Sequence, residues 1–580
     1  MIFFQNIDRT SLRGLPLLAA IVLTIGTQTA GQNSQPGKSE TETVRGTVIN
    51  AVTQAPIPRA LVLTADNRAA VLTDGEGHFE ISLPKQDANE VMTFSYPGSF
   101  PSVPRPYPRG GQTFFLIARK PGFVDDVGGS RPVVAASSGG DLTIALIPEA
   151  ILKGRITLAS GDAALGIMVQ LFSRQVVDGL PRWMQGRMDR ANSSGEFRFA
   201  ELQPGSYKLV TREFMDNDPI TNVPGAQQFG YPPVYYPGAA EFSAASTIEL
   251  TAGQEFEADL SLTRQAYYPV RIPIANASGI GGLSVSVQGQ RGPGYALGYN
   301  ASEQRVEGLL PNGNYVVEAS TFGQNSVNGT VSIRVTGAPV DAPAIALVAN
   351  SSIQLNVKEE FADTSWDASG TWSDGKRTFP LRGPRTYLQA SVESADDFPQ
   401  RQFGSIRPPT GPNDESLVME NLLPGRYWLR LHTSRGYIAS ATQGPTDVLR
   451  HPLQVGSGPA APIEITVRDD VAELDGTVTA LAQQTTLEAQ AAAPAQVWIY
   501  CVPLPDSTGE FAQFGVSGDG KFTSMGMAPG DYRILAFSAP HPRLPYRDPE
   551  AMKAYESKAT VVHLGAGQKA TVQVQTILIE

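Results

Sequence analysis

GEFRFAELQPGSYKL, residues 195–209, carries two of the signals that decide the fold of this chain. A glycine such as Gly195 accepts the positive φ angle of a tight hairpin turn, and Phe197 and Phe199 alternate along the strand that follows. Pro204 and Gly205 then suit the two central positions of a type II turn, and the tyrosine after them begins another strand. The segment therefore predicts two short strands joined by a tight turn.

Variants of the Pro-Gly-x-Tyr turn recur along the chain at a spacing of about one small domain. They are QPGSYKL from Gln203, LPNGNYVV from Leu310, LPGRYWL from Leu423 and APGDYRI from Ala528. The prolines of successive turns are 107, 113 and 105 residues apart. A fixed period of this kind indicates one structural unit that is used repeatedly.

Two further signals repeat with the turn. The hairpin signal returns as GKF from Gly520, while in the fourth repeat Glu415 and Leu417 take the glycine and phenylalanine positions. The first repeat has DGEGHFEI, residues 74–81, without the later tyrosine turn. An opening strand of the form apolar-x-Gly-x-apolar is present three times, as VRGTV at 44–48, LKGRI at 152–156 and LDGTV at 474–478. In the other two repeats the matching strands are expected near Tyr268–Ile274 and Ile353–Val357.

Short strands punctuated by glycine and proline are typical of antiparallel sandwiches. The prediction is an all-β fold, a tandem array of about five small antiparallel β-sandwich domains of the prealbumin-like or Ig-like kind. One short helix is expected at Pro549–Ser557, with proline at its start. The predicted boundaries define units one to five: 43–148, 149–264, 265–350, 351–468 and 469–580.

The opening strand, the D-x-x-G-x-F hairpin and the L-x-PG-x-Y turn together resemble carboxypeptidase regulatory-like domains, within the wider group of transthyretin-like and starch-binding-like sandwiches. The stretch YPPVYYPG from Tyr231 is similar to multi-domain exported proteins of soil bacteria such as the Acidobacteria. The match is good for units one, two and five, partial for unit four and weak for unit three. The resemblance implies a fold and an accessory role beside peptidases, receptors or carbohydrate-active proteins, and it transfers no catalytic residue.

The N-terminus predicts export. Arg9 and Arg13 precede the apolar run Leu15–Leu23, and small residues follow, so residues 1–30 are expected to be a cleaved signal peptide. The alternative is an uncleaved membrane anchor.

The formal net charge of −11 argues against a non-specific nucleic-acid binder. With Cys501 as the single cysteine, no intrachain disulfide can form, and this residue is expected to be a buried small hydrophobe.

Motifs for catalysis and cofactors are weak in this sequence. The five histidines lack metal-ligand spacing, and neither HExxH nor GxSxG is present. GVSGDGK at 515–521 is followed by Phe522, where a phosphate loop needs Ser or Thr, so nucleotide binding is not expected.

The acidic neighbours Glu359/Glu360, Asp396/Asp397 and Asp469/Asp470 are interpreted as solvated loop charges rather than glycosidase carboxylates, because neighbours on a strand face opposite sides. DGEG at 74–77 is interpreted as a hairpin, with a calcium loop as the alternative. No cofactor and no metal are predicted.

Aromatic side chains are the candidate ligand-binding residues. Tyr231, Tyr235 and Tyr236 lie in a proline-rich connection, and Trp366 and Trp372 lie in a polar stretch. Such rings could form a platform for sugars or a peptide. The alternative is that they pack their loops onto their own domain or between domains.

The function expected from the sequence is an exported, non-enzymatic binding or structural accessory of the bacterial envelope, periplasmic, on the outer surface or secreted. A carbohydrate-binding protein and a hydrolase with an unrecognised site are the alternatives. The expected partners are a polysaccharide or an envelope protein, without nucleic acid, nucleotide or membrane insertion after signal removal.

Overall fold

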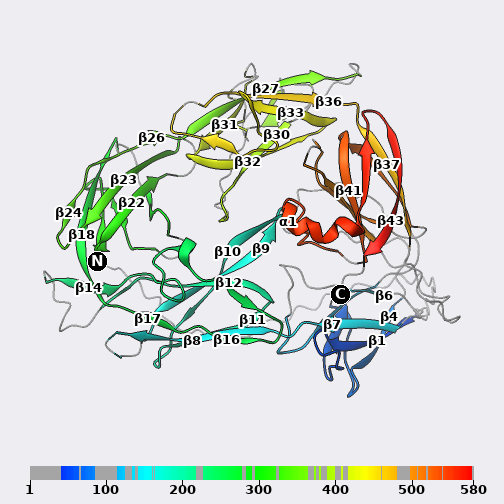
Figure 1. Cartoon of the computed structure of the whole chain (residues 1–580), viewed down its shortest axis with the longest axis horizontal. Helices are drawn as coiled ribbons and strands as arrows, with labels where there is room; N and C mark the ends of the chain where they lie inside the picture. The colour runs from blue at the N-terminus through cyan, green and yellow to red at the C-terminus, as the bar shows by residue number, and fades with distance from the viewer. Residues whose placement is uncertain are drawn as a thin grey trace, which may run out of the picture.

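The computed structural model describes residues 41–577 except 65–66, 85–113, 125–133, 137–140, 160, 162–163, 217–225, 277–281, 291–293, 322–324, 363–370, 374–377, 381–387, 399–405, 409, 411–413, 415, 459, 480–496, 506, 508, 517–519 and 539. The predicted signal peptide lies outside this range. Strands dominate the chain, which confirms the all-β class (Figure 1). The predicted helix is present as α1 (Pro549–Met552) followed by η2 (Lys553–Lys558). The Asp548 carboxylate caps α1 by accepting from the amides of Glu550 and Ala551.

The strands of units one to three divide between two sheets in each unit. Unit one has β4 (His78–Pro84), β1 (Thr41–Asn50) and β7 (Asp141–Leu146) in one sheet, and β3 (Ala70–Leu72), β2 (Leu61–Thr64), β5 (Phe114–Arg119) and β6 (Val134–Ala136) in the other. Unit two has β11 (Glu196–Leu202), β8 (Ala150–Leu158), β16 (Glu255–Glu257) and β17 (Leu260–Leu262) facing β10 (Leu180–Arg190), β9 (Met168–Val177), β12 (Gly205–Thr211) and β15 (Ile248–Leu250). Unit three has β18 (Gln265–Ala275), β21 (Arg305–Pro311), β20 (Gly298–Asn300), β24 (Val340–Asp341) and β25 (Ile345–Ala346), with β19 (Ser284–Val287), β22 (Gly313–Ser320), β23 (Val327–Val335) and β26 (Val348–Ala349) in its second sheet.

Unit four adds a two-stranded sheet to the two-sheet plan, and the strands of unit five join in one continuous sheet. Unit four has β31 (Leu417–Leu422), β27 (Ser351–Glu360), β36 (Ile463–Arg468), β33 (Tyr437–Gln443) and β34 (Thr446–Asp447), with β30 (Leu388–Ser394), β32 (Gly425–Thr433) and β35 (Leu453–Val455) in its second sheet and β28 (Thr371–Ser373) paired with β29 (Thr378–Pro380). Unit five joins β39 (Ala512–Val516), β38 (Val497–Pro503), β41 (Gly530–Phe537), β43 (Lys569–Ile577), β37 (Ala472–Thr479) and β40 (Lys521–Met527) in one path, with β42 (Thr560–Leu564) beside β41.

Each unit contains at least one parallel pairing among mostly antiparallel ones, and in every unit the opening strand takes part in it. The opening strand pairs antiparallel with the strand of the hairpin signal and parallel with a late strand of its unit, as β8 does with β11 and β16. The same arrangement holds for β1, β18, β27 and β37. The opening strand is therefore an interior strand in all five units, and the parallel pairings are a feature that the prediction of antiparallel sandwiches did not include.

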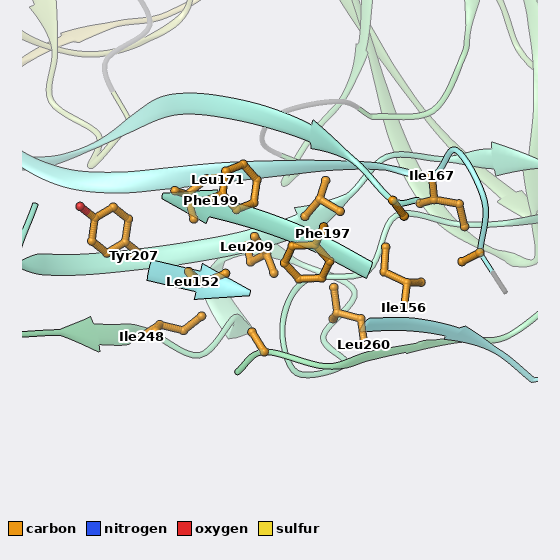
Figure 2. Close-up of a cluster of buried hydrophobic side chains, with 14 of the residues drawn as sticks. Leu152, Ile156, Ile167, Leu171, Phe197, Phe199, Tyr207, Leu209, Ile248 and Leu260 are labelled. Atoms are coloured by element: carbon orange, nitrogen blue, oxygen red, sulfur yellow. The ribbon is translucent and has the colours of Figure 1, made fainter. Parts of the chain in front are cut away.

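The opening-strand glycine and the hairpin phenylalanine are opposite each other. Gly154 pairs with Phe197 across β8 and β11, and a Cβ at Gly154 would lie 2.8 Å from the Phe197 ring. The pairs Gly46 with Phe79 and Gly476 with Phe522 have the same register. In unit four, Leu355 and Leu417 occupy the corresponding register. The two repeated signals are thus the two halves of one packing contact. Figure 2 shows the Phe197 ring among the apolar side chains in the core of unit two.

The tyrosine of the repeated turn closes a local hydrogen bond. The Tyr207 hydroxyl donates to the Gln203 carbonyl at 2.6 Å, and the Tyr532 hydroxyl donates to the Ala528 carbonyl at 2.8 Å. Tyr315 and Tyr427 donate in the same way to Pro311 and Leu423, at 2.9 Å each. A ring that packs into the core while its hydroxyl holds the chain four residues earlier fixes the entry into the second sheet, which is the arrangement called a tyrosine corner.

Neighbouring units are joined by more than their linkers. The strands β13 (Phe214–Met215) and β14 (Gln228–Tyr231) come from the range predicted for unit two, yet β14 pairs with β18 of unit three. Units three and four meet at Ser326, whose amide and hydroxyl both donate to the Asn421 Oδ1 of unit four, at 3.2 and 3.1 Å. Asp469, at the start of unit five, forms an ion pair with Arg435 of unit four at 2.5 Å.

The row of units curves back on itself. Figure 1 shows unit five, in orange and red, beside unit two, in cyan and green, after the chain has passed through units three and four. The hairpin of β9 and β10 reaches from unit two to both units four and five. Units two to five therefore form a closed arrangement, in which unit two contacts units four and five. The units do not form an extended spacer.

Candidate interaction site where units two, four and five meet

The predicted tyrosine platform is mostly packed inward. Tyr231 is 6% exposed and Tyr235 is 1% exposed, while Tyr236 is partly buried and packs edge-on against Phe256. The loop folds back onto the sheet of unit two because the amide of Tyr236 donates to the Leu209 carbonyl at 3.0 Å. An exposed platform at Tyr231 and Tyr235 was the wrong expectation, and the alternative of a loop packed on its own unit describes both rings.

The two predicted tryptophans lie in the polar stretch of unit four. Trp366 is outside the described residues. Trp372 lies in β28, opposite Phe379 of β29. Ligand binding by either tryptophan therefore stays a prediction.

Tyr235 belongs to an aromatic cluster on the outer face of the β9–β12 sheet. We define the aromatic box as Phe172, Trp183, Tyr235 and Phe242, all from unit two. A fifth ring, Phe398, comes from unit four, with its centroid 5.4 Å from that of Phe172 and 5.5 Å from that of Phe242. Both contacts are edge-to-face, the arrangement that aromatic quadrupoles favour.

A buried cation lies beside the aromatic box. Lys208 is 7% exposed, and its Nζ lies 4.5 Å from the ring centroid of Phe242 and 5.2 Å from that of Trp183. The ammonium donates to the Phe242 carbonyl at 2.9 Å. Burial, followed by repulsion from Arg174, lowers the pKa of Lys208. The aromatic faces and the carbonyl stabilise the charge in this position.

The unit-four segment 394–398 lies along the edge of β10. The backbone amide of Trp183 donates to the Asp397 carbonyl at 2.8 Å. Arg182, which is 2% exposed, donates from Nη1 to the carbonyls of Ser394 at 2.7 Å and Asp396 at 2.6 Å. Its other terminal nitrogen lies 3.2 Å from the carboxylate of Glu393. The arginine therefore holds an extended segment chiefly through its main chain.

The tip of the β9–β10 hairpin is the meeting point of three units. Asp178 has the positive φ of 48° that this tight turn requires, and its carboxylate pairs with Arg430 of unit four and with Arg547 of unit five, the latter at 3.1 Å. The Tyr546 hydroxyl also donates to Asp178. The Arg547 amide donates to the Gly179 carbonyl at 3.0 Å. One side chain thus links unit two to units four and five.

Strand β32 supplies the unit-four side of this junction from alternate residues. Trp428 lies beneath the Arg547 guanidinium, with 4.9 Å from Cζ to the ring centroid. Arg430 pairs with Asp178, and the His432 ring lies 3.7 Å from the Glu510 carboxylate of unit five. Because alternate residues of a strand share a face, this face of β32 is directed at the other units.

Two of the pairs of neighbouring acidic residues lie where one unit contacts another, and both pairs have bonding partners there. Asp469 and Asp470 are not solvated loop charges as interpreted, since Asp469 pairs with Arg435 and Asp470 with Arg468, each at 2.5 Å. The Asp470 carboxylate also accepts from the Tyr437 hydroxyl at 2.9 Å. Asp396 and Asp397 use their main-chain carbonyls to contact unit two.

The DGEG segment of unit one has the geometry of a hairpin turn. Asp74 accepts from the amides of Glu76 and His78 at 2.9 and 2.8 Å, which fits the hairpin interpretation.

Within the described ranges, no group of three His, Cys, Asp or Glu side chains is placed to hold a metal ion. Among those same residues no helix has the length and apolar composition to cross a bilayer.

Sequence reasoning did not single out Arg182, Asp178 or Phe398. Asp178-Gly179 is a recognisable hairpin signal, but nothing local to it indicates a partner more than 200 residues away. In the structure Val169–Phe172 is buried on both faces of β9, but Gln170 interrupts the apolar run in the sequence, so the covered outer face has no local sequence signal.

Comparisons with known proteins give no family and several weak structural similarities. No family model and no curated protein matches it. A streptococcal ancillary pilin is similar at 11% identity and a TM-score of 0.17, covering 53% of this chain and 99% of the pilin. The full-length RrgB pilus protein of Streptococcus pneumoniae is similar at 8% identity and a TM-score of 0.14, covering 74% and 98%, and the Bacillus anthracis TIE protein at 9% and 0.14, covering 73% of each chain. These values are too low to bear on this chain's function.

Proposed function

We propose that this protein is an exported, non-enzymatic accessory of the bacterial envelope, a closed scaffold of carboxypeptidase regulatory-like sandwiches that presents loops to a protein partner. The observation that carries the proposal is the junction at Asp178, where one hairpin joins units two, four and five. A closed row holds its loops at fixed mutual positions, so that several weak contacts to one partner add through effective concentration.

Several features favour a structural role for the conspicuous side chains. Arg182 is engaged with main-chain carbonyls, and Asp469 and Asp470 are engaged with arginines at the joint between units four and five. Each of these groups stabilises the position of one unit against another, which is what a scaffold needs. A charge already committed to such a contact is a poor candidate for acid–base catalysis.

A protein partner is favoured over a glycan by the placement of the tyrosines. Tyr231 and Tyr235 are buried, which removes two of the five rings predicted to form a sugar platform. Carbohydrate binding then depends on Tyr236, Trp366 and Trp372. A glycan-array screen of the Trp366→Ala/Trp372→Ala variant against the unchanged protein tests that candidate, and binding lost in the variant would favour a sugar receptor.

The proposal is tested in the bacterium that makes this protein, by deleting its gene and restoring it with tagged versions. We expect the tagged protein in the envelope or medium, shortened by the signal peptide, and we expect the deletion strain to become sensitive to detergent. Restoration should follow from the unchanged protein and from Glu80→Gln, which alters a single exposed ion pair with Arg45 in unit one. Asp178→Ala, which weakens closure, should restore less.

Two results would contradict this function. One is a purified protein that hydrolyses ester, peptide, phosphate or glycoside substrates. The other is full restoration by an Asp178→Ala variant that is shown to be open in solution, because the closed shape would then be irrelevant.

A further inference from the structure

The segment 394–398 contacts unit two in the way that a bound peptide would. Its main chain joins the edge of β10 through the Trp183 amide, as an added strand does. Arg182 holds two of its carbonyls, and Phe398 places a ring among Phe172 and Phe242 of the aromatic box. An extended main chain anchored by one aromatic side chain is a recurrent mode of peptide recognition.

The site and its occupant belong to separate cores. Every ring of the aromatic box comes from unit two, whose own core lies between its two sheets. Phe398 packs with the aromatic box and not with the described core of unit four, which is built on residues such as Ile353, Leu429 and Ile463. The contact can therefore separate while both units keep their packed interiors.

The occupant defines the chemistry of the ligand. It reads Ser-Ala-Asp-Asp-Phe at residues 394–398, with the side chains of Asp396 and Asp397 exposed. Lys208 and Arg174 lie at the Trp183 ring on the unit-two side. A cationic border and an aromatic pocket fit an extended segment in which acidic residues precede an aromatic residue.

We propose that unit two carries a peptide-binding site that accepts this same segment from a second copy of the chain, giving a dimer in which the closing contacts are exchanged. Opening the row exposes the aromatic box, and a surface of this kind needs a cover. A second copy supplies the matching segment and an equivalent open site, so both contacts form at once. The ion pairs of Asp178 with Arg430 and Arg547 would also form between the two copies, because Asp178 lies on the same side of the junction as the aromatic box and the two arginines lie on the other side.

Two variants separate the halves of the contact. Phe398→Ala removes the anchor of the segment, and Arg182→Ala removes the holder of its carbonyls. The full-length mature protein and both variants are opened in mild denaturant at high concentration, returned to buffer and measured by size-exclusion chromatography with light scattering. Circular dichroism checks that each variant is folded, and Phe242→Ala replaces Arg182→Ala if that variant is not.

The expected result is a dimer fraction for the unchanged protein that falls about tenfold or more in each variant alone, as loss of an anchor residue implies. An equimolar mixture of the two variants should recover a heterodimer, because one intact site then meets one intact segment. The proposal is overturned if the mixture remains as monomeric as its components, or if the variants dimerise as well as the unchanged protein. The first outcome confines the contact to one chain, and the second assigns the dimer to another surface.

Discussion

Gly154 lies directly opposite Phe197 in the register of β8 and β11, and the Phe197 ring occupies the space that a side chain at position 154 would need. A Cβ there would also lie 2.2 Å from the Ala258 carbonyl oxygen. The glycine is thus required by close approach on two sides, from the Phe197 ring and from the main chain between β16 and β17.

Gly154→Ala should destabilise unit two by about 1–3 kcal/mol, because the new methyl forces strands of a packed sheet apart. Hydrogen exchange read by mass spectrometry on peptides of β8 and β11 measures the loss. Gly238→Ala, in the loop of the same unit where a Cβ meets nothing within 4 Å, is the matched control. Equal effects in the two variants would contradict this account of the motif.

Tyr532→Phe should cost about 1–2 kcal/mol in unit five, because the buried Ala528 carbonyl loses its hydroxyl donor while the ring stays in place. Faster exchange of amides in β41 and β42 is the expected readout. Peptides of unit one provide the internal reference, since that unit has no turn of this kind in its described residues. Unchanged exchange would show that the tyrosine acts only through its ring.

Asp178→Ala should open the closed row in part. Exposed or half-exposed ion pairs contribute up to about 1 kcal/mol each, so the variant weakens closure without unfolding any unit. Small-angle scattering should show a larger radius of gyration, and added salt should move the unchanged protein in the same direction. Glu80→Gln is expected to change neither quantity. A variant as compact as the unchanged protein at every salt concentration would assign closure to the aromatic box.

Glu213 gives the joint between units two and three a pH dependence. Burial raises the pKa of Glu213, and its carboxylate accepts from the Ala296 amide of unit three at 2.8 Å. Because its pKa is raised in the folded state, Glu213 favours folding when it is protonated. This contribution to stability is complete below the unfolded carboxyl pKa of about 4.3 and is lost as pH rises through the folded-state pKa. Glu213→Gln should therefore match the unchanged protein at pH 4 and unfold at a higher temperature at pH 8. A difference that grows toward acid would contradict the sign.

Cys501 should be inert in the folded protein. It is fully buried, and burial raises the pKa of its thiol to about 12, so the thiolate is scarce at pH 8. Ellman's reagent is expected to detect no thiol in the native protein and one per chain after denaturation. Rapid native reaction would mean that unit five opens readily.

The local part of the fold was predictable because its signals are contacts between neighbours in one sheet. Gly154 with Phe197 and Tyr207 with Gln203 lie within single units, and their spacing repeats along the chain. Closure was not predictable, because Arg182 meets Ser394 across 212 residues with no periodic pattern to announce it. Tyr231 and Tyr235 were misplaced for a related reason: a proline-rich aromatic loop has the same sequence character whether its rings point outward or cover a sheet.

The pairing of β14 with β18 limits how this protein could have been assembled by the rearrangement of genes. A recombination breakpoint at the linker before β18 would separate a strand from the sheet that it completes, leaving an unpaired edge in the donor and the recipient alike. Units two and three therefore cannot be separated at this linker without breaking a sheet, although the repeated turn alone suggests independent modules.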